Sequence, residues 1–211
     1  MFKTQSIVND YQTIGSLISM TIAPNATASS ILDAAQRMMM TVGYNGLSFR
    51  DVAAAVGIKS ASVHYHYPTK GQLGAAVARR YTDRLVAHLG AIDQSGADPR
   101  AALAAYVAAI RTTLESDGKM CLCGMLAAEI DAVPPEVKAE VRRFVDLNVD
   151  WIAAIIARAT GGDPSCDSVR DHAMALFAAL EGAMMIARGS GDFARFDAMT
   201  AQLGRSGLWP R

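Results

Sequence analysis

The stretch from Ser48 to Leu73, SFRDVAAAVGIKSASVHYHYPTKGQL, constrains the fold more than any other part of the chain. Apolar residues at helical spacing predict a first short helix, and Gly57 ends it. A second short helix is predicted from about Ser60 to Tyr67, because Val63 and Tyr67 lie one turn apart and a proline follows. Two short helices around a glycine turn are typical of a helix-turn-helix.

The outer face of the second short helix carries hydrogen-bond donors and flat rings, namely Lys59, Ser60, Ser62, His64, Tyr65 and His66. Side chains of these kinds suit phosphates and the base edges of a DNA major groove. From Lys59 to Arg84 the chain has five basic residues and one acidic residue, a balance of +4, although its formal net charge is zero. The distribution of charge therefore predicts a basic footprint at the helix-turn-helix.

The rest of the chain also reads as helical. Half of its 211 residues are hydrophobic, and Val, Ile and Thr form no alternating runs, which disfavours strands. We expect an all-α fold of about nine helices, with a three-helix head and a C-terminal helical bundle. The predicted helices are, approximately, 29–42, 49–56, 60–67, 69–92, 100–116, 121–132, 134–159, 168–188 and 193–203. On the first of these, Ile31, Ala35, Met38 and Val42 are expected to face inward.

Other parts of the sequence limit the compartment and the class of protein. Residues 1–26 are periodic only weakly and indicate a flexible arm or a short irregular helix, with Met20 as an alternative start. Three cysteines and no cleavable signal indicate a reducing cytoplasm, and charged residues interrupt every predicted helix, so no membrane span is expected. No nucleophile–base pair, carboxylate dyad, glycine-rich phosphate loop or metal-ligand set is visible. We therefore expect no enzyme, no cofactor and no metal.

The segment Gly57 to Leu73 resembles the tetracycline-repressor (TetR/AcrR) family of bacterial transcription regulators. That family reads roughly Gly-Val-Ser-Lys-Gly-Thr-Leu-Tyr-x-His-Phe-x-Ser-Lys-Glu-x-Leu where this chain has GIKSASVHYHYPTKGQL. The phrase Leu180-Glu181-Gly182-Ala183 also resembles a recurrent phrase in the family's eighth helix. This chain departs from the pattern at His64, where the family usually has tyrosine, and at Gly71, where it usually has glutamate.

The resemblance implies a homodimer that binds a palindromic operator in double-stranded DNA and represses transcription until a small-molecule effector releases it. It implies a DNA-binding domain at 27–72 and an effector-binding and dimerisation domain at 73–211. By position, the implied phosphate contacts are Ser48, Ser62, His66 and Lys70, and the implied groove-facing set is Arg50, Lys59, Ser60, Ala61, His64 and Tyr65. Tyr67 is expected in the core, with its hydroxyl reaching toward DNA.

The eighth predicted helix is apolar nearly all round, so it must be buried on more than one side. Burial of one face inside the chain and one against a partner, together with the ninth helix, predicts a four-helix dimer interface. Its candidate residues are Ala175, Ala179, Gly182, Ala183, Ile186, Phe196 and Met199. An entirely intrachain core is the alternative.

A polar residue in the seventh predicted helix raises the question of a pocket. Asn148 sits within an apolar stripe and needs either a structural partner or a ligand, and Glu181 invites the same question. The candidate lining for a largely apolar effector is Met120, Cys121, Cys123, Met125, Phe144, Asn148, Trp151, Phe177 and Glu181.

Two other functions stay open beside that of an effector-controlled repressor. Cys121 and Cys123 could instead make the protein a thiol-based redox or electrophile sensor, which requires a stabilised thiolate, or they could be inert buried thiols. A helical module without a DNA role is the remaining alternative.

Overall fold

A computed structural model describes residues 26–116 and 119–209. The arm or short helix predicted for residues 1–26 lies outside them, apart from its last residue. The described residues form helices and connecting turns without a strand, which confirms the all-α prediction. The helices are α2 (Ala26–Val42), α3 (Phe49–Val56), α4 (Ser60–His66), α5 (Lys70–Gln94), α6 (Pro99–Glu115), α7 (Leu122–Ala128), α8 (Pro135–Thr160), α9 (Asp167–Ser190) and α10 (Ala194–Arg205).

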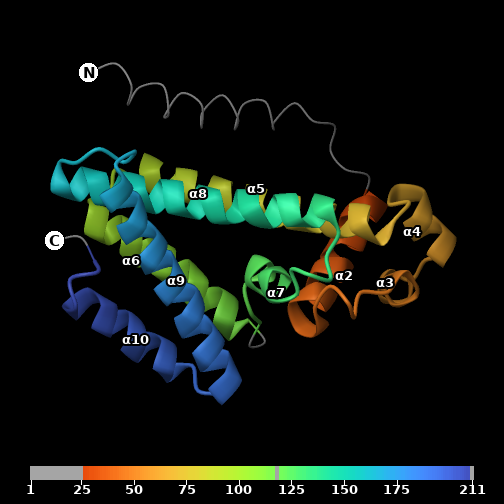
Figure 1. Cartoon of the computed structure of the whole chain (residues 1–211). Helices are drawn as coiled ribbons and strands as arrows, with labels where there is room; N and C mark the ends of the chain where they lie inside the picture. Colours follow the sequence, from red (N-terminus) through yellow and green to blue (C-terminus); the bar gives the residue numbers. More distant parts are fainter. Residues whose placement is uncertain (1–25, 117–118, 210–211) are drawn as a thin grey trace.

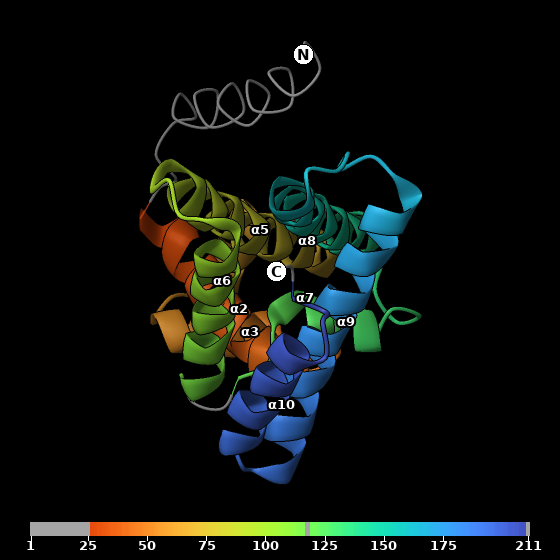
Figure 2. The ribbon, with the colours of Figure 1, turned by 90° about the vertical axis from the view of Figure 1, so that its left-hand side faces the viewer.

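Two long helices connect the two ends of the molecule. Figure 1 shows α5 and α8 running along each other, with α2, α3 and α4 at one end and α6, α9 and α10 at the other. In the view turned by 90°, α9 and α10 lie together on one side of the body (Figure 2). The helix-turn-helix therefore lies at one end of this pair of helices.

The buried apolar side chains form two clusters, one in the head and one in the body. The head cluster contains Ile31, Val52, Val63 and Leu73, and it extends into the other elements through Leu122 of α7 and Val137 of α8. The body cluster contains side chains from α5, α6, α8, α9 and α10, together with Cys121 and Cys123 beside and within α7. The short helix α7 therefore belongs to both cores.

Helices α3 and α5 are capped where the sequence predicts, whereas α2 begins at Ala26, before the predicted start at residue 29. The hydroxyl of Ser48 accepts from the Asp51 backbone N–H at 3.4 Å, and the Thr69 hydroxyl accepts from the Gln72 backbone N–H at 3.1 Å. Gly57 closes α3 with a φ of 76°, the left-handed conformation that favours glycine. These caps satisfy backbone groups that helix ends leave unpaired.

Two local predictions are wrong. Val42 is 57% exposed instead of buried, because the following Tyr44 enters the head core and the buried face of α2 runs through Met39. The predicted helix at 121–132 ends at Ala128, because Glu129 and the residues after it form turns before Pro134.

Charged residues within the helices were expected to exclude a membrane span, but they do not exclude one for α9. Among the described residues, α9 alone is long and apolar enough to cross a membrane by length and composition. The core helix of a soluble protein passes the same test, and α9 packs against α6, α8 and α10. We therefore interpret α9 as a core helix.

Candidate functional site

Helix α4 presents one face to the core and the other to solvent. Val63 is fully buried, whereas Lys59, Ala61, His64 and Tyr65 are exposed. Tyr65 is 84% exposed, far more than a large aromatic side chain usually is. Ser60, Ser62 and His66 are half-buried at the edges of this face. The structure thus brings the predicted groove-facing residues of α4 together on one surface.

The aromatic rings of this surface contact one another and α3. The imidazole of His64 packs on the ring of Phe49 from α3, with 4.4 Å between the ring centroids. The rings of Tyr65 and His66 meet edge to face at 5.3 Å. His64, one of the departures from the family pattern, is exposed and packs against Phe49 of α3.

The predicted residues on α3 differ in how they are engaged. The Ser48 hydroxyl caps α3 through its oxygen, which leaves its O–H free to donate to another group. Arg50 lies next to Asp51, with 3.4 Å between Nε and Oδ1, but its side chain is 87% exposed. An ion pair so open to water is weak, so the Arg50 guanidinium is accessible to an anion.

Two residues near the start of α5 are tied to the head. Lys70 Nζ donates to the Asn45 carbonyl at 3.1 Å and lies 4.7 Å above the ring of Tyr44. Burial lowers the pKa of Lys70, and Glu129 partly offsets this. Tyr67 packs against the head core as predicted, and burial raises its pKa against the opposing effect of Arg80.

The second departure from the family pattern, Gly71, has a packing reason. A Cβ at this position would overlap the carboxylate of Glu136 and approach Pro134, both at the start of α8. Because glycine has no side chain, α5 and the start of α8 can approach closely here.

Part of the predicted basic footprint is paired with acidic residues of the same chain. Arg80 and Arg84 both pair with Asp33 of α2, at 2.8 and 3.5 Å, and Arg79 pairs with Glu140 of α8 at 2.7 Å. The balance of +4 along the sequence therefore overstates the charge that the head offers to DNA. The sequence does not indicate this pairing, because the acidic partners lie far away along the chain.

A link between α7 and the head was also missed. Glu129 Oε2 accepts from the Asn45 backbone N–H at 3.0 Å, while Lys70 binds the carbonyl of the same residue. The turn between α2 and α3 is thus held from α5 and from the end of α7. No local pattern in the sequence indicates such a contact across 84 positions.

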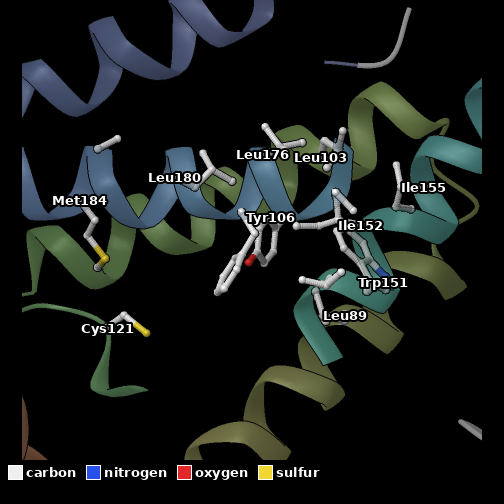
Figure 3. Packing of buried hydrophobic residues seen from close by; sticks show 14 of the residues in the cluster. Leu89, Leu103, Tyr106, Cys121, Trp151, Ile152, Ile155, Leu176, Leu180 and Met184 are labelled. Carbon is white, nitrogen blue, oxygen red and sulfur yellow. The ribbon is translucent and has the colours of Figure 1, made fainter. Parts of the chain in front are cut away.

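Most of the predicted pocket lining is core. Asn148 accepts from the Tyr106 hydroxyl at 2.5 Å and donates to the Phe144 carbonyl at 2.7 Å, so its amide has structural partners. The Trp151 indole donates to Asp93 at 3.1 Å. Figure 3 shows Tyr106 and Trp151 packed among aliphatic side chains, with Cys121 and Met184 toward the other end of the cluster. Phe144 and Phe177 are buried in the same cluster.

The two thiols near α7 are buried and not activated. Burial raises the pKa of Cys121 and that of Cys123 well above the ordinary thiol range, and the nearby Glu181 carboxylate raises both further. A thiolate is therefore disfavoured at both positions, which does not favour the redox alternative. Among the described residues, no group of three His, Cys, Asp or Glu side chains is placed to hold a metal ion.

A pocket of about 300 Å³ lies between α7 and α9. Met120 and Met125 from the predicted set line it. The other lining residues, which sequence reasoning missed, are Gly124, Ala128, Met185, Arg188 and Gly189. Glu181, from the predicted set, lies behind Gly124: a Cβ on that glycine would be 2.7 Å from Glu181 Oε2.

The predicted dimer residues divide between surface and core. Ala175 and Ile186 are exposed on α9, and Ala179, Gly182 and Met199 are half-buried. Ala183 and Phe196 have no exposed surface, because they pack in the body core of the single chain. We therefore leave these two residues out of a candidate interface.

Comparison with known proteins agrees with this arrangement. Residues 31–77 match the sequence profile described as bacterial regulatory proteins, tetR family. The fold is similar to the crystal structure of a TetR transcriptional regulator from Legionella pneumophila, with a TM-score of 0.80 and 31% identity, over 89% of this chain and 99% of that one. It is similar to a TetR-family transcriptional regulator from Agrobacterium tumefaciens, with a TM-score of 0.79 and 32% identity, over 86% and 97% of the two chains.

A curated relative matches over a shorter stretch. The HTH-type transcriptional repressor KstR2 from Rhodococcus jostii is 33% identical over 79 residues, which are 37% of this chain and 39% of that protein. The two solved relatives, by contrast, exceed 30% identity over nearly their full lengths. On the match of its helix-turn-helix and of its whole fold, the chain belongs to the TetR family of bacterial transcription regulators.

Proposed function

We propose that this regulator is a repressor that binds a palindromic operator as a homodimer and is released by a small-molecule effector. The observation that carries the proposal is the outer face of α4, where Tyr65, His64 and Lys59 are exposed side by side while Val63 anchors the helix from behind. The relative KstR2 is itself named a repressor.

In this proposal the head, residues 27–72, places α4 in the major groove. Lys59, Ser60, Ala61, His64 and Tyr65, with Arg50 of α3, face the bases. Ser48, Ser62, His66 and Lys70 contact phosphates and fix the register, and the Tyr67 hydroxyl lies near the backbone. Lys70 exchanges the Asn45 carbonyl for a phosphate oxygen, because a charge-assisted contact with an anion is the stronger of the two.

The dimer is proposed to form through α9 and α10 of residues 73–211. Met174 and Ile186 are large apolar side chains exposed on α9, and Ala175 lies exposed next to Met174. Gly182 has open space where a Cβ would be, so a partner helix can approach the backbone closely. Isologous pairing of this face would place two heads about a two-fold axis, as a palindromic operator requires.

The effector is proposed to bind at the pocket between α7 and α9 and to act on the head through α7. Glu129, at the end of α7, holds the Asn45 backbone N–H in the turn that precedes α3. An effector that prefers a shifted α7 would loosen this turn and change the spacing of the two heads. We propose a regulator of the cytoplasm that performs no catalysis.

The test is binding of the purified full chain to DNA from around its own coding region, measured by fluorescence anisotropy at two salt concentrations. We expect salt-sensitive binding to one fragment by a dimer, well above binding to an unrelated fragment of equal length. Equal binding to all fragments at both salt concentrations would contradict an operator-specific role.

A further inference from the structure

The pocket between α7 and α9 has an adaptable apolar lining. Three of its residues are methionines, Met120, Met125 and Met185, whose unbranched thioethers adapt to ligands of different shape. Its remaining walls are small residues and the side chain of Arg188, whose Nη1 donates to Met125 Sδ at 3.1 Å. A volume of about 300 Å³ suits a small molecule with a short apolar body.

A buried carboxylate oxygen lies directly behind this lining. Glu181 Oε2 is buried and has no hydrogen-bond partner among the described residues. It points at Gly124, where a Cβ would be 2.7 Å from Oε2 and 3.3 Å from Met120 Cε. Gly124 and Met120 both line the pocket, so the carboxylate oxygen lies directly behind two of its lining residues.

The groups that face Glu181 do not neutralise it. They are the hydroxyls of Tyr81 from α5 and Tyr106 from α6, and the thiols of Cys121 and Cys123 beside α7. Burial raises the pKa of Glu181 to about 6, and the Cys121 thiol beside it opposes this only in part. Near neutral pH the carboxylate is thus mostly ionised, buried and without a counter-charge among these neighbours, which is an unfavourable state unless a donor arrives.

We propose that the effector is a small amphiphilic amine, whose protonated nitrogen pairs with Glu181 and whose apolar body lies among the methionines of the pocket. The inference rests on the proposed function, in which this pocket binds the effector. Arg188 lies seven residues further along α9, and its guanidinium is directed at Met125, whose Sδ accepts from Nη1 at 3.1 Å. The alternative is an anionic ligand, which Arg188 would bind and Glu181 would repel.

The experiment compares three probes of equal chain length, octylamine, octanol and octanoate, by isothermal titration calorimetry with the full chain near neutral pH. We expect octylamine to bind about tenfold or more tighter than octanol, as a hydrogen bond to a charged partner implies. In Glu181→Gln this preference should disappear while octanol affinity is unchanged. Arg188→Gln is the matched control, because it removes a charge from the same pocket and should keep the preference for the amine.

A second variant tests the geometry without removing the carboxylate. Gly124→Ala places a methyl group against the free end of the Glu181 side chain, which can rotate away, so the fold should be retained with its melting temperature little changed. The methyl group would fill the space between the carboxylate and the pocket. Octylamine affinity should therefore fall about tenfold or more, as in Glu181→Gln.

Two results would overturn the inference. Tightest binding of octanoate, lost in Arg188→Gln, would assign the pocket to anions, and equal affinity for all three probes would make it merely apolar. Because the calorimetry contains no DNA, Glu181-dependent amine binding would support this inference even if the protein does not bind DNA. Operator binding without such amine binding would leave the proposed repressor in place and refute the amine alone.

Discussion

Tyr65 and Lys70 lie five positions apart in the sequence, and the structure puts them to different uses. Tyr65 is 84% exposed, and among the rings of the described residues it contacts that of its neighbour His66, whereas Lys70 is tied to Asn45 and Tyr44. A side chain that makes few contacts within the protein can be replaced with little loss of stability. A side chain with internal contacts needs a control that separates those contacts from binding.

Changing Tyr65 to Ala should alter the preference among operator variants and leave stability within about 0.5 kcal/mol. The ring is placed to contact particular bases, so variants at the contacted position should lose their difference in affinity while others keep theirs. Anisotropy titrations against a set of single-base operator variants measure this. Tyr65→Phe is the control, since it keeps the ring and loses only the hydroxyl. A uniform loss across all operators would refute base contact.

Changing Lys70 to Ala should weaken binding to every DNA sequence and reduce the salt slope by about one. The loss of the Asn45 contact confounds this variant, because the turn before α3 would also loosen. Lys70→Gln is the matched variant: its amide can still donate to the Asn45 carbonyl but carries no charge. A reduced slope in both variants assigns the effect to phosphate contact, and an unchanged slope in Lys70→Gln would contradict it.

Glu181 should make the protein less stable as the pH rises from 4.5 to about 6. Its ordinary pKa is 4.5 and burial raises it to about 6, so the folded state holds the proton more strongly than the unfolded chain does. The stabilisation from protonation is complete below the lower value and is lost through the upper one, a change of about 2 kcal/mol. Urea unfolding of the wild type and Glu181→Gln across this range should show the difference; parallel curves would contradict it.

Among the helices, α7 is the element that sequence reasoning described least well. Its caps are local, but the side chain of its C-cap residue Glu129 binds the Asn45 backbone, which no local pattern indicates. The boundaries of α3 and α5, by contrast, follow from Ser48, Gly57 and Thr69, each of which acts within three or four residues. Helix caps made by neighbouring residues can be predicted from a sequence, whereas contacts between residues far apart in it cannot.

The same distinction explains the candidate site. The outward face of α4 could be predicted because helical periodicity alone separates Val63 from Tyr65. The pairing of Arg80 with Asp33 and that of Asn148 with Tyr106 could not, because each joins two different helices. The prediction of the buried face of α2 was wrong at Val42 for a related reason. The residues after the helix, and not its periodicity, determine which side chains of its last turn are buried.

Gly43 ends α2 under a tight constraint and should not accept a side chain. Its φ is 77°, and a Cβ there would overlap the Glu129 carboxylate. Gly43→Ala should cost about 1–2 kcal/mol of unfolding free energy. Gly90→Ala, inside α5 with nothing within 4 Å, is the matched control and should stabilise by about 0.5–1 kcal/mol. Urea denaturation of both variants gives the comparison; similar effects would show that neither φ nor Glu129 matters.

At the scale of the whole molecule, a charge placed on the exposed apolar face of α9 should disrupt both dimerisation and operator binding. Ile186 is 50% exposed, so Ile186→Glu should leave the single chain folded and yield a monomer in sedimentation or light scattering. A single head makes half of the contacts, so operator affinity should fall by about a hundredfold or more. Val42→Glu introduces the same charge at a similarly exposed site in the head and should stay dimeric. A dimeric Ile186→Glu would place the interface elsewhere.

The membership of α7 in both cores bears on anyone who wishes to re-target such a regulator. A chimera that takes its head from a relative and joins it at residue 72 would bring a foreign surface against Leu122, Leu126 and Val137 of this chain. It would also lose the Asn45 partner of Glu129 unless the donor has a matching turn. Grafted heads should therefore carry their own α7 and the first turns of α8, and short transplants of α4 alone are the safer route to a new operator.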